Sequence, residues 1–168
     1  AGGTAACPAA QPIRALVLLC GSVRPTPLSA GIGRSILDLP IDANQSVLDY
    51  WQQLVSTLTD QLQLECLPVR VMINRRSDPP AVRATDEHVV MRVEEDASEY
   101  RGTAGVLHDL AHDYDDNDFL LVANGAQVML EPLSNLVTEM AQTQGDISIV
   151  SHADGTPSSM MLVRCGVL

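Results

Sequence analysis

The stretch that decides the fold is "IRALVLLC" at residues 13–20, an almost continuously apolar run that ends at Gly21. A short apolar run bounded by glycine is typical of a strand that is buried on both faces of a sheet. The following stretch, "GSVRPTPLSAGIGR" (21–34), contains glycines, prolines and two arginines but no acidic residue. The sequence therefore predicts a buried strand that leads into a cationic loop.

The composition describes a globular chain of 168 residues, 46% hydrophobic and only 18% charged. This length is enough for one domain with a substantial core. The 21 carboxylates outnumber the ten cations and give a net charge of −11. This excess of negative charge disfavours nonspecific binding to polyanions, so we expect neither nucleic acid nor a membrane as a partner. All ten cations are arginine, which excludes a Schiff-base or P-loop lysine.

Residues 1–12 are small and polar and lack the charged and apolar regions of a signal peptide. We interpret them as a flexible tail before a single α/β domain at 13–168. No apolar run approaches the ~18 residues of a transmembrane helix. The cysteines have no metal-type CxxC spacing, and Cys20 and Cys165 end apolar runs. Buried free thiols are expected in a reducing cytosol, so we expect a cytoplasmic protein.

Along the chain, the spacing of the apolar residues alternates between the repeat of a helix and the repeat of a strand. It predicts helices at 47–62, at 103–114 and from residue 132, the first of them capped by Asn44 or Ser46. It predicts further strands at 68–74, 88–94, 119–125, 146–151 and 160–165. This order favours an α/β fold, a mainly parallel Rossmann-like sheet with helices on both faces and a C-terminal hairpin. The runs at 13–20 and 119–123 should be central strands.

The cationic loop leaves the carboxyl end of the first strand, where open α/β sheets bind their ligands. Its backbone N–H groups can meet phosphate oxygens, and Arg24 and Arg34 can add bidentate hydrogen bonds. Neither a GxxxxGK[ST] P-loop nor an in-register GxGxxG fingerprint is present. A phosphate site here must therefore be of another type.

Three motifs occur in the order of one enzyme family. "RPTPLS" (24–29) fits R-L-x-P-L-T, "YRGTAGVLHDLA" (100–111) fits GTAxAL, and "FLLVANGAQVML" (119–130) fits FLVLNGDVL. On these motifs the chain resembles the sugar-1-phosphate nucleotidylyltransferases. The resemblance implies a nucleotidyltransferase-like fold that binds a nucleoside triphosphate and a sugar 1-phosphate and releases pyrophosphate.

The resemblance also implies roles for individual residues. Arg24 would hold the triphosphate, and Arg34 would contact the phosphate between the substrates, which makes these two the candidate catalytic residues. Gly21 and Ser22 would offer backbone contacts. The remaining nucleotide-binding positions are Gly102 and Thr103, near the base, and Asn124.

The chain departs from the family pattern at functional positions. Ala126 stands where the family has its Mg²⁺-binding aspartate, and Arg34 stands in place of a lysine. A methyl group cannot ligate magnesium, so a Mg²⁺ cofactor is doubtful and we assign no metal ligand. The chain also ends before the family's sugar-binding half, so we expect that part of the catalytic fold to be lacking.

Two functions therefore stay open. The first is a nucleotidylyltransferase-like enzyme domain, and the second is a non-catalytic descendant that binds nucleotide or a protein partner. A homo-oligomer is compatible with both. His108 and His112, four residues apart as in zinc-binding helices, lack a glutamate base between them, and we interpret them as surface histidines.

Overall fold

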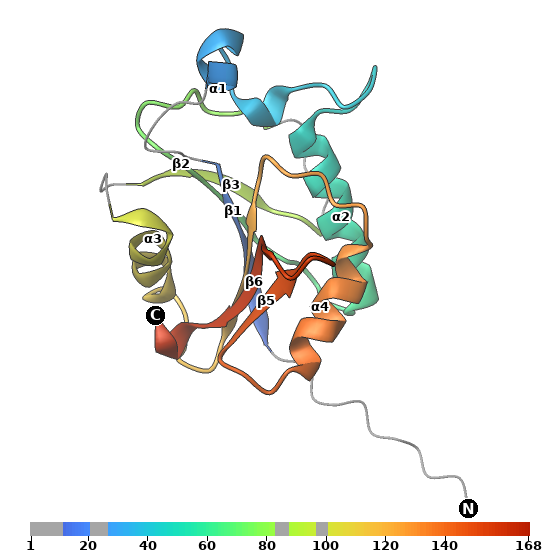
Figure 1. The fold of residues 1–168 in the computed structure, drawn as a ribbon, viewed down its shortest axis with the longest axis vertical. Helices are drawn as coiled ribbons and strands as arrows, with labels where there is room; N and C mark the ends of the chain where they lie inside the picture. The colour runs from blue at the N-terminus through green and yellow to red at the C-terminus, as the bar shows by residue number, and fades with distance from the viewer. Residues whose placement is uncertain (1–11, 21–26, 83–87, 97–100) are drawn as a thin grey trace, which may run out of the picture.

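The computed structural model describes residues 12–20, 27–82, 88–96 and 101–168, which form an α/β fold (Figure 1). The strands are β1 (Ile13–Leu19), β2 (Val69–Ile73), β3 (Met91–Glu95), β4 (Phe119–Asn124), β5 (Ile147–Ser151) and β6 (Pro157–Arg164). The helices are α1 (Pro27–Ile32), α2 (Val47–Gln61), α3 (Gly102–Ala111) and α4 (Leu133–Gln142). Two 3-10 turns, η1 (Ile36–Asp38) and η2 (Cys165–Val167), complete the described elements.

The strands form one sheet in the order β3-β2-β1-β4-β6-β5. β3, β2, β1 and β4 are parallel, whereas β6 runs antiparallel to β4 and pairs with β5 as a hairpin. The two strands expected at the centre, β1 and β4, are neighbours in the middle of this order. That prediction is confirmed, and the sheet as a whole is mixed because the C-terminal hairpin reverses direction.

Helices cover both faces of the sheet, as expected (Figure 1). Along β1, Leu16 and Leu18 face a core built with α2 and α4, whereas Ala15 and Val17 face a second core under α3. Successive side chains of a strand point to opposite faces, so a strand between two helical layers must be apolar on both. This requirement explains the unbroken apolar runs of the sequence.

Helix α2 begins at a capping box. Ser46 is the N-cap residue; its hydroxyl accepts from the Asp49 N–H, while the Asp49 carboxylate accepts from the Ser46 N–H. This reciprocal pair satisfies two of the backbone donors that a helix start leaves open. Of the two caps that the sequence predicts, Ser46 is the one used.

Most predicted elements lie within a few residues of their expected positions, and three differences stand out. β3 begins at Met91 instead of residue 88, although Val89 is already buried and the Val90 carbonyl accepts from Val69. The six-residue α1 and the turn η1 were not predicted. Both are too short to show a clear helical repeat of apolar residues.

Arg70 ties the α3 layer to the edge of the sheet. Its side chain, only 14% exposed, donates to both Glu94 oxygens at 2.8 and 2.7 Å and to Asp113 at 2.6 Å. The guanidinium also lies 5.9 Å from the centre of the Tyr114 ring. These hydrogen bonds raise the pKa of Arg70, so it is charged at all working pH values. One cation thus joins β2, β3 and the chain after α3.

We predict that Arg70→Met lowers the free energy of unfolding by about 1.5–3 kcal/mol, because it leaves the partly buried Glu94 carboxylate without its partner. Arg92→Met, at an exposed residue of β3, is the matched control and should change stability by less than about 0.5 kcal/mol. Urea unfolding followed by circular dichroism measures both. Equal losses in the two variants would contradict the structural role of Arg70.

Candidate functional site

The candidate site lies at the carboxyl ends of the parallel strands. β1 has β2 on one side and β4 on the other, so the strand order reverses at β1. Such a reversal opens a crevice outside the strand ends, where α/β sheets bind ligands. α1 and η1 lie at this end of the molecule (Figure 1). The Asp38 carboxylate of η1 accepts from the Ala81 N–H at 2.9 Å, which joins the β2–β3 connection to the same region.

Gly125, directly after β4, is the point where four segments meet. Its N–H donates to the Leu19 carbonyl of β1, and its carbonyl accepts from the buried indole N–H of Trp51 in α2 at 2.9 Å. A Cβ at this position would lie 2.3 Å from the Cys20 sulfur and 3.2 Å from Leu37 of η1. A side chain at this position would therefore have to displace the Cys20 thiol.

Cys20 is held in the same packed region, where its thiol lies against Gly125. Burial raises the pKa of the Cys20 thiol to about 12. The thiol is therefore protonated at neutral pH and acts as a small packing group, because nucleophilic cysteines need a lowered pKa. Within the described residues Cys20, Cys66 and Cys165 are free thiols, and Cys165 is buried as expected.

Asn124 belongs to a row of residues that crosses the sheet at this end. The strand register aligns Glu94 with Met72, Met72 with Leu19, and Leu19 with Asn124. The row lies on the α3 face, because Leu19 and Met72 pack with the α3 core. Glu94 on β3 and Asn124 on β4 are the polar residues of this row, so each of its two ends carries a hydrogen-bonding side chain.

Ser159 adds a polar group beside the end of β4, and the sequence did not predict it. β6 carries a bulge here: Ile149 and Ser151 of β5 pair with Met161 and Pro157, so three residues of β6 face one of β5. The hydroxyl of Ser159, within the bulge, is shielded from solvent and has no hydrogen-bond partner. Bulges occur often beside active sites, where they redirect a side chain. No sequence signal marks this one.

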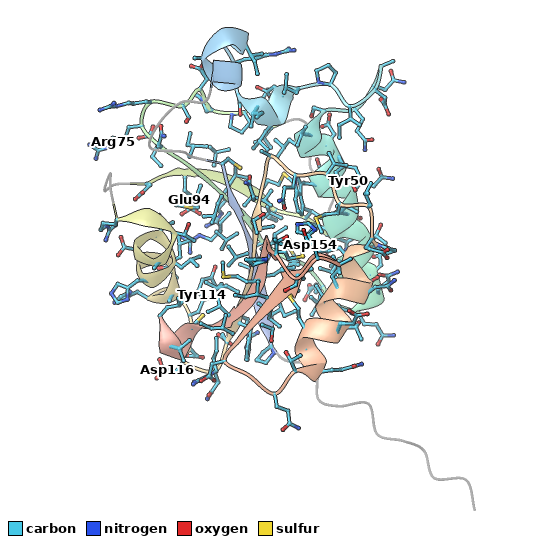
Figure 2. The ribbon with its side chains drawn as sticks, in the orientation of Figure 1. Tyr50, Arg75, Glu94, Tyr114, Asp116 and Asp154 are labelled. Atoms are coloured by element: carbon cyan, nitrogen blue, oxygen red, sulfur yellow. The ribbon has the colours of Figure 1, made fainter. Side chains whose placement is uncertain are left out.

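Exposed arginines gather around the same end. Arg34 follows α1, while Arg75 and Arg76 follow β2, and all three are exposed. Figure 2 shows Arg75 projecting outward from the side of the upper half of the molecule, whereas Tyr114 and Asp116 lie in its lower half. Arg101 precedes α3 and forms ion pairs with Asp96 and Asp109. The carboxyl edge thus carries exposed arginines together with carboxylates such as Asp78, Glu95 and Asp96.

The sequence-predicted site residues fall into two groups. Gly21, Ser22 and Arg24 lie outside the described residues. Gly102 and Thr103 are exposed at the start of α3, and Gly102 has a φ of +66°, which favours glycine. The Arg101–Asp96 ion pair joins this helix start to the end of β3. Arg34, Gly102, Thr103 and Asn124 therefore all come from segments at the carboxyl edge of the sheet.

The residues at the expected magnesium position do not fit a magnesium ion. Ala126 is exposed and carries no oxygen ligand, and the Asn124 carboxamide oxygen accepts from the Ala126 N–H at 2.9 Å. Within the described ranges, no group of three histidine, cysteine, aspartate or glutamate residues is placed to hold a metal ion. Magnesium prefers several hard oxygen ligands.

The two histidines of α3 are exposed, in agreement with their interpretation as surface residues. Their rings meet edge to face, with centroids 4.8 Å apart. The Nδ1 atoms lie 2.6 Å from the Leu168 oxygen for His108 and 2.8 Å from the His108 carbonyl for His112. One nitrogen of each ring is thus used within the chain.

Solved structures share this arrangement of elements. Rv0371c from Mycobacterium tuberculosis matches with a TM-score of 0.56 at 16% identity over 94% of this chain and 77% of that protein. A putative glucose-1-phosphate thymidylyltransferase from Bacillus anthracis, solved in complex with sucrose, matches with a TM-score of 0.53 at 10% identity over 92% and 72%. The fold is nucleotidyltransferase-like.

A homolog of Rv0371c from Mycobacterium sp. strain JC1 matches in the same way, with a TM-score of 0.52 at 12% identity over 91% of this chain and 70% of that protein. No protein-family model matches the sequence, and a comparison with curated proteins finds no relative. At these identities the structural likeness establishes the nucleotidyltransferase-like fold alone. Over the described residues, no helix is both long enough and apolar enough to cross a bilayer.

We predict that Gly125→Ala destabilises the fold by about 1–3 kcal/mol, because the added methyl group overlaps the Cys20 sulfur. Gly31→Ala, whose Cβ would meet no atom within 4 Å, is the matched control and should not destabilise. Combining Gly125→Ala with Cys20→Ala should recover part of the loss, which thermal unfolding of the double-mutant cycle measures. Strictly additive effects would show that the two residues are not in contact.

Proposed function

We propose that this chain binds a nucleoside triphosphate and a sugar 1-phosphate at the carboxyl edge of its sheet. The observation that carries the proposal is the strand reversal at β1, with Asn124 and the exposed Arg34 and Arg75 on segments around it. The nucleotidyltransferase-like fold and the three sequence motifs support the same assignment. One neighbour, a putative thymidylyltransferase, was solved with a sugar bound.

The distribution of arginines supports an anionic ligand. Arg14, Arg70 and Arg164 form ion pairs with carboxylates in the body of the fold. By contrast, Arg34 and Arg75 are exposed at the candidate site, and no carboxylate among the described residues forms an ion pair with either. Phosphate groups are the natural ligands of such arginines, which can bind them with paired hydrogen bonds.

Sugar recognition requires neutral and acidic hydrogen-bonding groups in addition to cations. Asn124 and the unpartnered hydroxyl of Ser159 lie on adjacent strands beside the end of β4. Glu94 lies on the same row, but its carboxylate is held by Arg70. Because the Ser159 hydroxyl is shielded from solvent, we assign the sugar hydroxyls to Asn124 and the phosphates to the arginines.

Ala126 favours a second candidate, a nucleotide-binding domain without turnover. Phosphoryl transfer needs cations that offset the charge on the transferring group, and a metal usually supplies part of this charge. Because the described donor set does not fit magnesium, we derive no catalytic step through a metal. Arginines can still neutralise a bound triphosphate, so binding is expected to survive where transfer is slow.

We predict that Arg24→Ala weakens nucleoside triphosphate binding by about 1.5–3 kcal/mol, the range for hydrogen bonds to charged groups. Arg34→Ala should weaken it by a smaller amount if Arg34 contacts only the phosphate that lies between the substrates. Isothermal titration calorimetry with each of the common triphosphates measures these affinities. Arg92→Ala, at an exposed arginine on β3, is the control for the loss of one cation. No binding by the parent chain would reject the proposal.

We predict little pyrophosphate release by the parent chain when sugar 1-phosphates and Mg²⁺ are supplied. Ala126→Asp should introduce a magnesium ligand and raise the Mg²⁺-dependent nucleotide affinity by about tenfold, which corresponds to about 1.4 kcal/mol. Gln127→Asp, one residue along the turn, is the matched control. Robust turnover by the parent that Arg24→Ala abolishes would show instead that the chain is an active transferase.

A further inference from the structure

Asn124, the last residue of β4, has a side chain whose orientation is fixed by the turn that follows. Its carboxamide oxygen accepts from the Ala126 N–H at 2.9 Å. Its main-chain carbonyl accepts from the Gln127 N–H at 3.2 Å, so side chain and backbone close the same turn. A backbone N–H bonds only to an acceptor, so the atom that faces Ala126 is the oxygen and not the nitrogen.

The amino group of Asn124 is the part of the side chain that is left for a ligand. The oxygen and the nitrogen of a planar carboxamide point in different directions, so Nδ2 is directed away from the turn. No described residue accepts a hydrogen bond from it. Leu19, the β1 partner of Asn124, is apolar. Ser159 would face Asn124 if the β4–β6 register continued past Val122 and Met161, and its hydroxyl makes no hydrogen bond.

This amino group is also held in place and accessible. Among the described residues, the Ser159 hydroxyl is the one shielded side-chain group without a partner, so the unpartnered Asn124 amino group is not shielded in the same way. The backbone beside it is fixed, because the N–H of Gly125 donates to the Leu19 carbonyl. A donor that is fixed before binding discriminates between ligand atoms by their chemistry, because it does not turn to present its oxygen instead.

We infer that Asn124 makes the proposed site selective for sugar phosphates that present a neutral acceptor oxygen to it, against amino sugars that present an ammonium group. The inference rests on the proposed function and adds the class of sugar. A hydroxyl or an acetamido oxygen can accept from Nδ2, whereas an ammonium group has three donors and no acceptor. An ammonium group at this position leaves two donors facing each other, and sites built to hydrogen-bond a ligand reject analogues that cannot complete the bond.

Asn124→Asp separates the two functions of this side chain. Aspartate has nearly the same shape and keeps an oxygen for the Ala126 N–H, so the turn is retained. Its second oxygen replaces the amino group, which turns a donor into a charged acceptor. An ammonium group on the ligand can then form a charge-assisted hydrogen bond. The variant should therefore reverse the preference of the parent chain.

Isothermal titration calorimetry with glucose, galactose and mannose 1-phosphates, with and without a nucleoside triphosphate, first identifies the hexose phosphate that binds most tightly. Analogues of it with one hydroxyl replaced by an amino group are then compared. In the parent, the amino group at one position should weaken binding at least about tenfold. Asn124→Asp should make the same analogue the tighter ligand. The affinity ratio within one variant is compared, because a new carboxylate repels every sugar phosphate alike.

Gln127→Glu is the matched control, since it makes the same amide-to-carboxylate change in the same turn, and it should alter the ratio by less than about twofold. Thermal unfolding checks the geometry without a ligand: Asn124→Asp should unfold near the parent temperature and Asn124→Ala below it. Equal destabilisation by these two variants would overturn the inference. An unchanged ratio in Asn124→Asp, with a parent that binds hexose phosphate, would overturn the inference alone. A parent that binds none of the sugar phosphates would reject the proposed function together with it.

Discussion

The contact on which the architecture depends is the close approach of β1, β4, η1 and α2 at Gly125. Without a side chain there, the end of β4 lies against Cys20 and Leu37, and the Gly125 carbonyl receives the indole N–H of Trp51. Trp51 is fully buried, so an unpaired indole would be costly. This one interaction fixes α2 across the central strands.

The described arginines differ in whether they pair with carboxylates. Three of them satisfy carboxylates in the body of the fold: Arg14 with Asp118, Arg70 with Glu94 and Asp113, and Arg164 with Asp146. Exposed arginines then collect on the connections at the carboxyl edge. Net charge describes the whole surface, whereas ligand binding depends on the local field at a crevice.

The candidate site has some of the features that the sequence resemblance implies and lacks others. The strand reversal, the glycine-led start of α3 and Asn124 are present. The exposed Ala126 has no ligand for magnesium, and the bulge of β6 holds a hydroxyl without a partner.

The sequence by itself determined the element order, the buried strands β1 and β4 and the helices on both faces, because burial on two faces demands unbroken apolar runs. It also gave the side-chain types of the loops, because the arginines, the glycines and Ala126 can be read directly from the sequence. Asp118 ends an acidic run of the sequence, yet it is buried against Arg14, because only the folded chain brings residues 104 positions apart together. The bulge at Ser159 and the register row through Asn124 were likewise decided by tertiary structure. Such features depend on which strands are neighbours and on their register, and local periodicity carries no information about either.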